Sequence, residues 1–236
     1  MREGRGKEEL RNFKFYPNYL KTPEGSCLFE IGNTVVLATA TIETKVPPFL
    51  RELEEGWITA EYFMHPRATP ERNVKDLRGK DGRSIEISRL ISRSLRGSCD
   101  RKKLKDYTII IDCEVLQADG GTRTACINAG FVALYIATRY MLKNKLLDED
   151  PIDKFLGSIS VGKINGEIYL DLSYEEDLNA EVDLNISMLE DGRIVDIQGT
   201  AEKGSLNKEE LIKLIDVAKK GIDKIIEEEK RILLSL

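Results

Sequence analysis

The stretch that decides the fold is Tyr107-Thr-Ile-Ile-Ile-Asp-Cys-Glu-Val-Leu116, followed by Gln117-Ala-Asp-Gly-Gly-Thr-Arg-Thr124 and the apolar residues 125–142. The first part is rich in β-branched residues, which predicts a buried strand. Residues 125–142 are rich in Ala, Leu and Ile at helical spacing, which predicts a helix. The chain therefore carries a Gly-Gly pair at a strand-to-helix junction.

This junction has the chemistry of an anion cradle. Gly120 and Gly121 leave backbone N–H groups uncovered at the start of the predicted helix, where negative charge is stabilised. Thr122 and Thr124 add hydroxyl donors, and Arg123 adds a guanidinium that can bind phosphate through two donors. A plain glycine turn with an exposed arginine is the structural alternative.

Turn signals organise the rest of the chain. Residues 27–42 predict a hairpin around Gly32-Asn33, residues 159–172 predict one around Asn165-Gly166, and residues 180–198 predict a third around Glu190-Asp-Gly192. Apolar stripes predict helices over 84–96 and 207–236. Strands mixed with helices in this order indicate an α+β fold. No linker separates two parts, so residues 1–236 are expected to form a single domain.

Basic residues concentrate in the first half. The chain has a net charge of −5, yet residues 66–105 hold 13 Lys/Arg against 5 Asp/Glu. This asymmetry favours a nucleic-acid-binding face on an acidic body. Within the helix 84–96, Arg89, Arg93 and Arg96 share a face that could follow an RNA backbone or pair with acidic neighbours at a subunit boundary. Both interpretations stay open.

A second charged cluster is acidic. Asp177 and Asp183 stand six residues apart beside Glu175, Glu176 and Glu181. Hard oxygen ligands at this spacing suit Mg²⁺, which keeps several waters and bridges to phosphates. Charge alone does not choose among the five carboxylates, and an acidic turn without a function is the alternative.

Composition excludes several other classes of protein. Four scattered cysteines without C-x-x-C spacing predict buried thiols, not disulfides or a zinc site. His65 is the only histidine, which excludes a multi-histidine metal site. The charged N-terminus does not resemble a signal peptide, and no apolar stretch is expected to reach the roughly 20 residues of a membrane span. A cytoplasmic protein without membrane contact is expected.

The junction also carries a resemblance. Gln117-Ala-Asp-Gly-Gly-Thr-Arg-Thr-Ala125 resembles a signature of the bacterial ribonuclease PH family, and the likeness continues in order from Met1 to about Lys230. The other matching stretches are Glu24-Gly25-Ser26, Gly56-Trp-Ile-Thr-Ala-Glu-Tyr62, Pro66-Arg-Ala-Thr69, Gly82-Arg83, Ser160-Val-Gly162, Asp171-Leu172 and Gln198-Gly-Thr-Ala-Glu202.

The resemblance implies a fold and an activity. The fold would be two fused, pseudo-symmetric sheet–helix units, like the second domain of a small-subunit ribosomal protein. The activity would be reversible, phosphate-dependent 3′-to-5′ trimming of tRNA precursors and other RNAs, releasing nucleoside 5′-diphosphates. Inorganic phosphate would be the cosubstrate and Mg²⁺ the cofactor. The assembly would be a homohexamer built as a trimer of dimers. The alternative is a non-catalytic or partner-dependent ring subunit of an exosome-like complex.

The resemblance also implies roles for individual residues. Arg83 would bind phosphate together with Gly121, Thr122 and Arg123. Asp177 and Asp183 would be catalytic, one as a metal ligand and the other as a proton donor to the leaving group. Arg67, Arg72 and Lys75 would contact tRNA and support assembly, with Lys75 in place of the usual arginine. The loop from there to Arg83 is about two residues shorter than usual.

Overall fold

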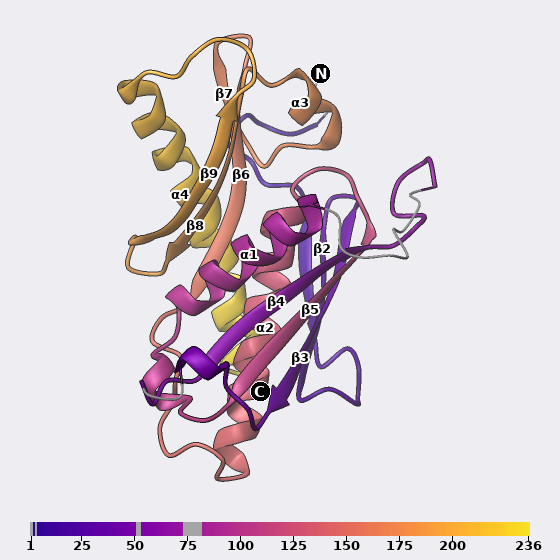
Figure 1. The fold of residues 1–236 in the computed structure, drawn as a ribbon. Coiled ribbons are helices and arrows are strands. Elements are labelled where there is room, and N and C mark those ends of the chain that lie inside the picture. The colour runs from indigo at the N-terminus through magenta and orange to yellow at the C-terminus, as the bar shows by residue number, and fades with distance from the viewer. Residues whose placement is uncertain (1, 3, 51–52, 73–81) are drawn as a thin grey trace.

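The computed structural model describes residue 2 and residues 4–50, 53–72 and 82–236. These residues form two β-sheets with helices packed on and between them (Figure 1). The strands are β1 (Phe13–Pro17), β2 (Gly25–Ile31), β3 (Thr34–Glu43), β4 (Trp57–Met64), β5 (Thr108–Gln117), β6 (Leu156–Ile164), β7 (Glu167–Leu170), β8 (Val182–Leu189) and β9 (Ile194–Ala201). The helices are α1 (Gly82–Gly97), α2 (Thr122–Lys143), α3 (Tyr174–Asn179) and α4 (Lys208–Leu233).

The first sheet has the order β1-β2-β3-β5-β4 and the second has the order β7-β6-β8-β9. Most neighbours are antiparallel, but β4 runs parallel to β5, so the first sheet is mixed. All three predicted hairpins are confirmed, as β2–β3, β6–β7 and β8–β9. The α+β class is therefore confirmed.

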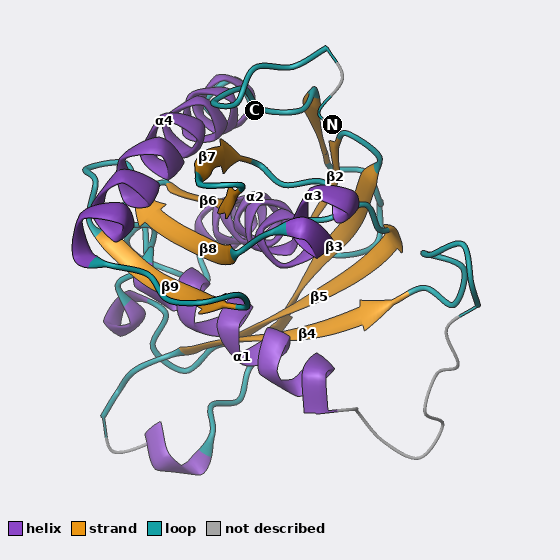
Figure 2. Cartoon of the chain, turned by 90° about the horizontal axis from the view of Figure 1, so that it is seen from above, coloured by secondary structure: helices purple, strands orange, loops and turns teal. Residues whose placement is uncertain are grey.

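Helix α2 lies between the two sheets, as Figure 2 shows. It packs against β2, β3 and β5 on one side and against β6 on the other, and its residues are buried over most of its length. One apolar core consequently spans both halves of the molecule. Because α2 supplies side chains to both sheets, it is apolar all round instead of amphipathic.

The length of α2 corrects one expectation. Thr122–Lys143 has 22 residues, and an 18-residue window within it has a mean hydropathy of 1.3, so among the described helices it alone has the length and composition of a membrane span. In this protein 78% of that window is buried inside the fold, which is typical of a core helix.

Close packing of α2 on the first sheet depends on Gly25. A Cβ atom at this position would lie 2.0 Å from the carbonyl oxygen of Ala133 in α2. Only glycine lets the strand approach the helix backbone so closely. The Glu24-Gly25-Ser26 motif of the sequence is thus a packing element.

Helix α4 covers the second sheet. Asn207 caps its N-terminus in a capping box with Glu210, as the asparagine N-cap predicts. Leu214, Ala218 and Ile222 lie on its buried stripe, which confirms the predicted core-packing helix. The order of elements inferred from the sequence omitted β1, β4 and α3.

Candidate active site

One cleft, of about 1210 Å³, collects residues from both halves of the molecule. It lies where the N-terminus of α2 faces α3 and the start of β8, with the first turn of α1 at its edge. The sequence-predicted residues that line it are Arg67, Arg83, Gly121, Thr122, Arg123, Asp177 and Asp183. Residues that are far apart in the chain are thus brought to one surface.

The glycine pair of the predicted cradle lies at the junction of β5 and α2. Gly120 and Gly121 have φ values of +75° and +64°, and Gly121 is the N-cap residue of α2, with no side chain capping the helix. A Cβ on Gly120 would lie 2.5 Å from the carbonyl oxygen of Leu172. Glycine is therefore required both by the left-handed backbone and by the close approach of the α3 segment. Residues 120–123 line the cleft at the start of α2, where an anion is stabilised.

Arg123 provides the clearest sign of a missing anionic partner. Its Nε atom is buried and has no hydrogen-bond partner among the described residues. A buried donor without a partner is unfavourable unless a ligand satisfies it. Since Arg123 lines the cleft, a bound phosphate group would supply the acceptor.

Arg83 lies in the first turn of α1 and is exposed at the cleft. Its charge and that of Arg123 both act on the pKa of Asp177, which means that the two arginines and this aspartate share one electrostatic environment. The lining of the cleft therefore combines arginine side chains with carboxylates.

The two aspartates come from adjacent elements. Asp177 belongs to α3, which begins at Ser173 with a capping box to Glu176, and Asp183 belongs to β8. Removal from water is the main cause that raises the pKa of Asp183 to about 6; the charge of Asp177 acts in the same direction and that of Arg123 opposes it. Removal from water also raises the pKa of Asp177, against the effect of Arg123 and Arg83.

Magnesium fits this donor set. Two carboxylates that repel each other in a partly desolvated cleft gain from a divalent cation between them, and Mg²⁺ is bound in proteins by one or two carboxylates with water and phosphate oxygens. The described residues contain no group of three or more His, Cys, Asp or Glu side chains that could hold a metal ion. A fully protein-ligated transition-metal site is therefore absent from that part of the chain.

The three glutamates near the two aspartates, Glu175, Glu176 and Glu181, have different surroundings. Glu176 binds Arg2 and Arg5, and Glu181 accepts from the backbone N–H of Gly166. Glu175 alone of the three lines the cleft. The structure thus sets two of the three glutamates in structural contacts.

The predicted RNA-binding residues are dispersed. Arg67 lines the cleft. Arg72 is exposed and does not belong to the described lining, and Lys75 falls outside the described residues. Arg89, Arg93 and Arg96, further along α1 than Arg83, do not belong to the described lining of the cleft.

Two of those α1 arginines have partners within the chain. Arg93 lies 3.5 Å from Asp196 of β9. Arg96 is half-buried over the ring of Trp57, 4.3 Å from its centroid, and donates to the carbonyl oxygen of Ile58. Arg89 is exposed. These contacts lie within the chain, with Arg93 beside an acidic side chain and Arg96 packed on Trp57. The RNA-binding and subunit-boundary interpretations both stay open.

The cleft also contains residues that sequence reasoning did not select. Tyr174 is 57% exposed and lines the cleft beside Asp177. Asn33 and Asn185 line it as well. The S-x-x-E pattern of Ser173 to Glu176 would have placed Tyr174 at the start of a helix. No local signal marks the two asparagines.

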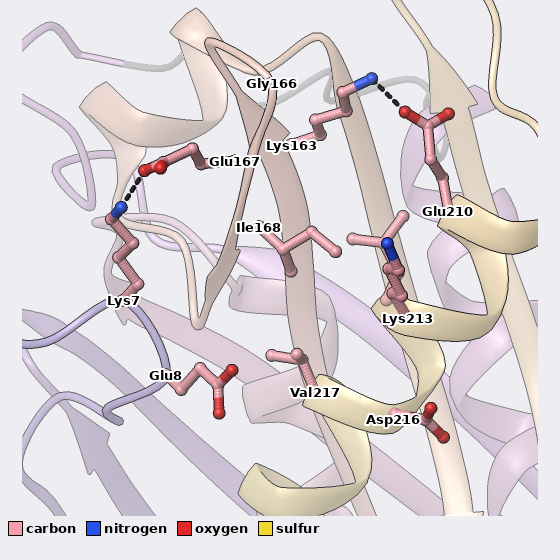
Figure 3. Close-up of a pocket in the computed structure, with 11 residues that line it drawn as sticks. Lys7, Glu8, Lys163, Gly166, Glu167, Ile168, Glu210, Lys213, Asp216 and Val217 are labelled. Atoms are coloured by element: carbon pink, nitrogen blue, oxygen red, sulfur yellow. Dashed lines mark hydrogen bonds and ion pairs between the residues drawn. The ribbon is translucent and has the colours of Figure 1, made fainter.

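A second pocket, of about 490 Å³, lies elsewhere (Figure 3). Its walls are the β6–β7 hairpin, the N-terminal segment and α4. Four of its charged side chains already pair, Lys7 with Glu167 and Lys163 with Glu210. Its floor includes Ile168 and Val217. Compensated charges over an apolar floor make it a poorer anion site than the cleft.

Comparisons with known proteins agree with these observations. Two family models match, described as the 3′ exoribonuclease family, domain 1, over residues 9–139 and domain 2 over residues 154–221. A protein of Bacillus mycoides (strain KBAB4) named ribonuclease PH is 45% identical over 234 residues, which cover 98% of this chain and 96% of that protein.

Solved structures share the fold. A chain of the Archaeoglobus fulgidus exosome, with RNA bound to the active site, has a TM-score of 0.81 and 25% identity over 95% of this chain and 91% of its own. Rice (Oryza sativa) Rrp46 has a TM-score of 0.78 at 19% identity, covering 98% of both chains. At that identity the second likeness concerns the fold alone. Together with the two family models, these structures confirm the two-unit architecture that the resemblance implies.

Proposed function

The chain belongs to the 3′ exoribonuclease family and is a phosphorolytic ribonuclease of the ribonuclease PH type, and we propose that the cleft between α2 and α3 is its active site. The observation that carries this proposal is the convergence of Arg83, the Gly121–Arg123 backbone and the Asp177–Asp183 pair on one cleft. The first group suits a phosphate cosubstrate and the second suits a metal ion and the leaving group.

Inorganic phosphate is the nucleophile. Arg83, Arg123 and the N–H groups at the start of α2 hold it in line with the last phosphodiester bond of the RNA. A phosphate oxygen forms a bond to the phosphorus, and the bond from that phosphorus to the 3′ oxygen of the preceding nucleotide breaks. The products are a nucleoside 5′-diphosphate and an RNA that is one nucleotide shorter. A phosphodiester is exchanged for a phosphoanhydride of similar energy, so the reaction is reversible.

The main barrier is the approach of two anions, so positioning and charge neutralisation carry most of the catalysis. Asp177 and Asp183 would hold Mg²⁺, which when bound neutralises negative charge on the phosphate oxygens. One of the two aspartates gives the 3′ oxygen its proton.

RNA is the substrate, and we propose that 3′ ends of tRNA precursors are among its targets and that the assembly is a hexamer, a trimer of dimers. Arg67 at the cleft supports RNA contact at the site, and so does the basic character of the sequence that follows it. A non-catalytic ring subunit is the second candidate. The cleft argues against it. Arg123 Nε is buried without a hydrogen-bond partner among the described residues, and Arg123 shares the cleft with Asp177 and Asp183, a combination that suits catalysis.

The test uses a 3′-extended RNA with and without phosphate, followed by separation of nucleoside mono- and diphosphates. We expect diphosphates, formed only with phosphate. Arg83→Ala should abolish turnover while RNA binding persists, and Arg193→Ala, an exposed arginine in the β8–β9 turn, should behave as wild type. Monophosphate release in phosphate-free buffer would establish a hydrolase and overturn the proposal.

A further inference from the structure

Arg11 lies immediately behind the phosphate cradle, outside the cleft-lining residues. We infer that Arg11 is a positioning residue that fixes the carbonyl groups of Asp119 and Gly120, so that the N–H groups of the cradle point into the cleft. The inference rests on the proposed function, because the cradle is taken to bind the phosphate cosubstrate. Its role is separate from that of Arg83 and Arg123, which face the cleft.

One edge of the Arg11 guanidinium is held by Asp171. The Nη2 atom donates to Oδ1 of Asp171 at 2.7 Å, and the backbone N–H of Arg11 donates to Oδ2 at 2.7 Å. Both side chains are buried, with 9% exposure for Arg11 and 1% for Asp171. Several charge-assisted bonds to one carboxylate fix both the place and the plane of the guanidinium.

The other edge of the guanidinium contacts the cradle. Nη1 of Arg11 donates to the carbonyl oxygen of Asp119, and Nη2 lies 3.5 Å from that of Gly120. A Cβ atom added to Gly121 would meet Nη2 at 3.2 Å. The guanidinium therefore packs directly against the back of the glycine turn.

Thr34 of β3 holds the same turn from the first sheet and shares the carbonyl oxygen of Gly120 with Arg11. Its hydroxyl donates to the carbonyl oxygen of Gly120 at 2.7 Å and accepts from the N–H of Asp119 at 2.9 Å. The carboxylate of Asp119 accepts from Asn33 on one side and from the N–H of Tyr174 on the other. The turn is thus clamped between the two halves of the molecule.

The geometry of the peptide bond gives these contacts their consequence. In a trans peptide the C=O and the following N–H lie in one plane and point in opposite directions. Holding the carbonyls of Asp119 and Gly120 toward Arg11 and Thr34 therefore turns the N–H groups of Gly120 and Gly121 the other way. Donors that are oriented before the ligand arrives bind it without reorganisation.

Arg5 separates positioning from simple charge pairing. Its guanidinium also binds Asp171, at 2.9 Å, and reaches Glu176 at 3.2 Å. None of its described hydrogen bonds goes to the 119–121 turn. Loss of Arg5 removes one partner of Asp171 and leaves every contact to the 119–121 turn. Loss of Arg11 removes a partner of Asp171 and also the arginine contacts to the carbonyls of that turn. Asp171 itself has a φ of +56°, which marks a conformation that the surrounding contacts maintain.

The experiment compares Arg11→Met with Arg5→Met in the full chain. For each variant, KM for phosphate, kcat and the thermal midpoint are measured, together with the rise in that midpoint caused by phosphate alone. We expect Arg11→Met to raise KM for phosphate about tenfold or more and to reduce phosphate protection, because its cradle donors are no longer pre-oriented. Arg5→Met should lower the thermal midpoint with less than about a twofold change in KM.

Two further variants keep the test decisive. Thr34→Val removes the second clamp at nearly constant volume and should raise KM for phosphate in the same direction, even if Arg11→Met fails to fold. Arg11→Lys keeps the charge at Asp171 but lacks the fork, so an intermediate KM is expected.

The outcomes are distinguishable. If the wild-type enzyme needs phosphate and both Arg11→Met and Thr34→Val keep the wild-type KM, Arg11 is merely structural and the inference is wrong. If the wild-type enzyme releases nucleoside monophosphates without phosphate, the proposed function itself fails.

Discussion

Asn128 of α2 and Ser158 of β6 form a reciprocal pair of hydrogen bonds in the core. Asn128 Nδ2 donates to the carbonyl oxygen of Ser158 at 2.9 Å, and the N–H of Ser158 donates to Asn128 Oδ1 at 2.8 Å. Asn128 is 1% exposed. One amide thus satisfies both backbone groups of a strand residue and ties the central helix to the second sheet.

The first prediction is that Asn128→Ala destabilises the protein by about 2–4 kcal/mol, because it leaves a buried N–H and a buried C=O without partners. Urea unfolding measures the change. Asn144→Ala is the matched control, since the exposed Asn144 side chain donates only to the nearby carbonyl of Tyr140 and should cost under about 1 kcal/mol. Equal midpoints for the two variants would show that the buried pair contributes nothing special.

The second prediction concerns Glu229, which is fully buried on α4 and whose two carboxylate oxygens have no hydrogen-bond partner in the described part of the chain. Burial raises the pKa of this carboxyl well above its usual value. A raised folded-state pKa means that its stability contribution is complete below the unfolded pKa and is lost as the pH rises toward the folded one.

Glu229→Met should therefore make the protein more stable at pH 8, and the advantage over wild type should shrink as the pH is lowered to 5, by up to about 1.4 kcal/mol per pH unit. Glu227→Met, at an exposed position two residues earlier, is the control. Chemical unfolding at several pH values provides the measurement. A stability difference between the Glu229→Met variant and wild type that does not vary with pH would contradict the assignment of Glu229 as a buried titrating group.

The third prediction separates the carboxylates of the cleft. Asp177→Asn and Asp183→Asn should each lower kcat by orders of magnitude and leave the thermal midpoint nearly unchanged or raised, because both carboxylates repel each other in a desolvated place. Glu175→Gln is the matched control in the same cleft. Full activity in either aspartate variant, with loss of activity in Glu175→Gln, would move the catalytic role to Glu175.

The fourth prediction concerns assembly. Ala68, between Arg67 and the rest of the basic loop, is buried, and its carbonyl oxygen accepts from the N–H of Ala118 next to the cradle. This contact therefore holds Ala68, next to Arg67, at the cleft. Replacing Arg67 and Arg72 together by Ala should reduce oligomer size and tRNA trimming, while a short single-stranded RNA is degraded more nearly as usual. Lys219→Ala on α4 serves as the charge control, and light scattering follows the assembly. A wild-type protein that is monomeric and fully active would end this hypothesis.

Much of the fold is predictable from local patterns. The turn pairs at Gly32-Asn33 and Asn165-Gly166 mark two hairpins, and the Asn207 cap marks the start of α4. Strand β4 is missing from the predicted elements, although the residues of Trp57-Ile-Thr-Ala-Glu-Tyr62 alternate in burial, because polar Thr and Glu weaken its apolar signal. Strand β1 is an edge strand of five residues that includes a lysine and a proline, which gives a weak pattern.

The candidate site is predictable only in part. Motifs mark the cradle and the aspartates because their residue types carry the chemistry. The supporting contacts are not marked, because Arg11 meets its partner Asp171 across 160 residues and an arginine before an edge strand has no local signature. Which glutamates are engaged elsewhere, as Glu176 is with Arg2, likewise depends on long-range packing.

Helix α2 contributes both to the candidate phosphate site and to the hydrophobic core. Its first turn forms the cradle, and the rest of it is the middle of the core that both sheets share. Partial opening of the phosphate site would therefore require opening of a helix that is buried over most of its length, and such openings carry nearly the free energy of global unfolding. Substrate affinity and native structure should consequently be lost over the same temperature range, with no inactive but folded stage before it.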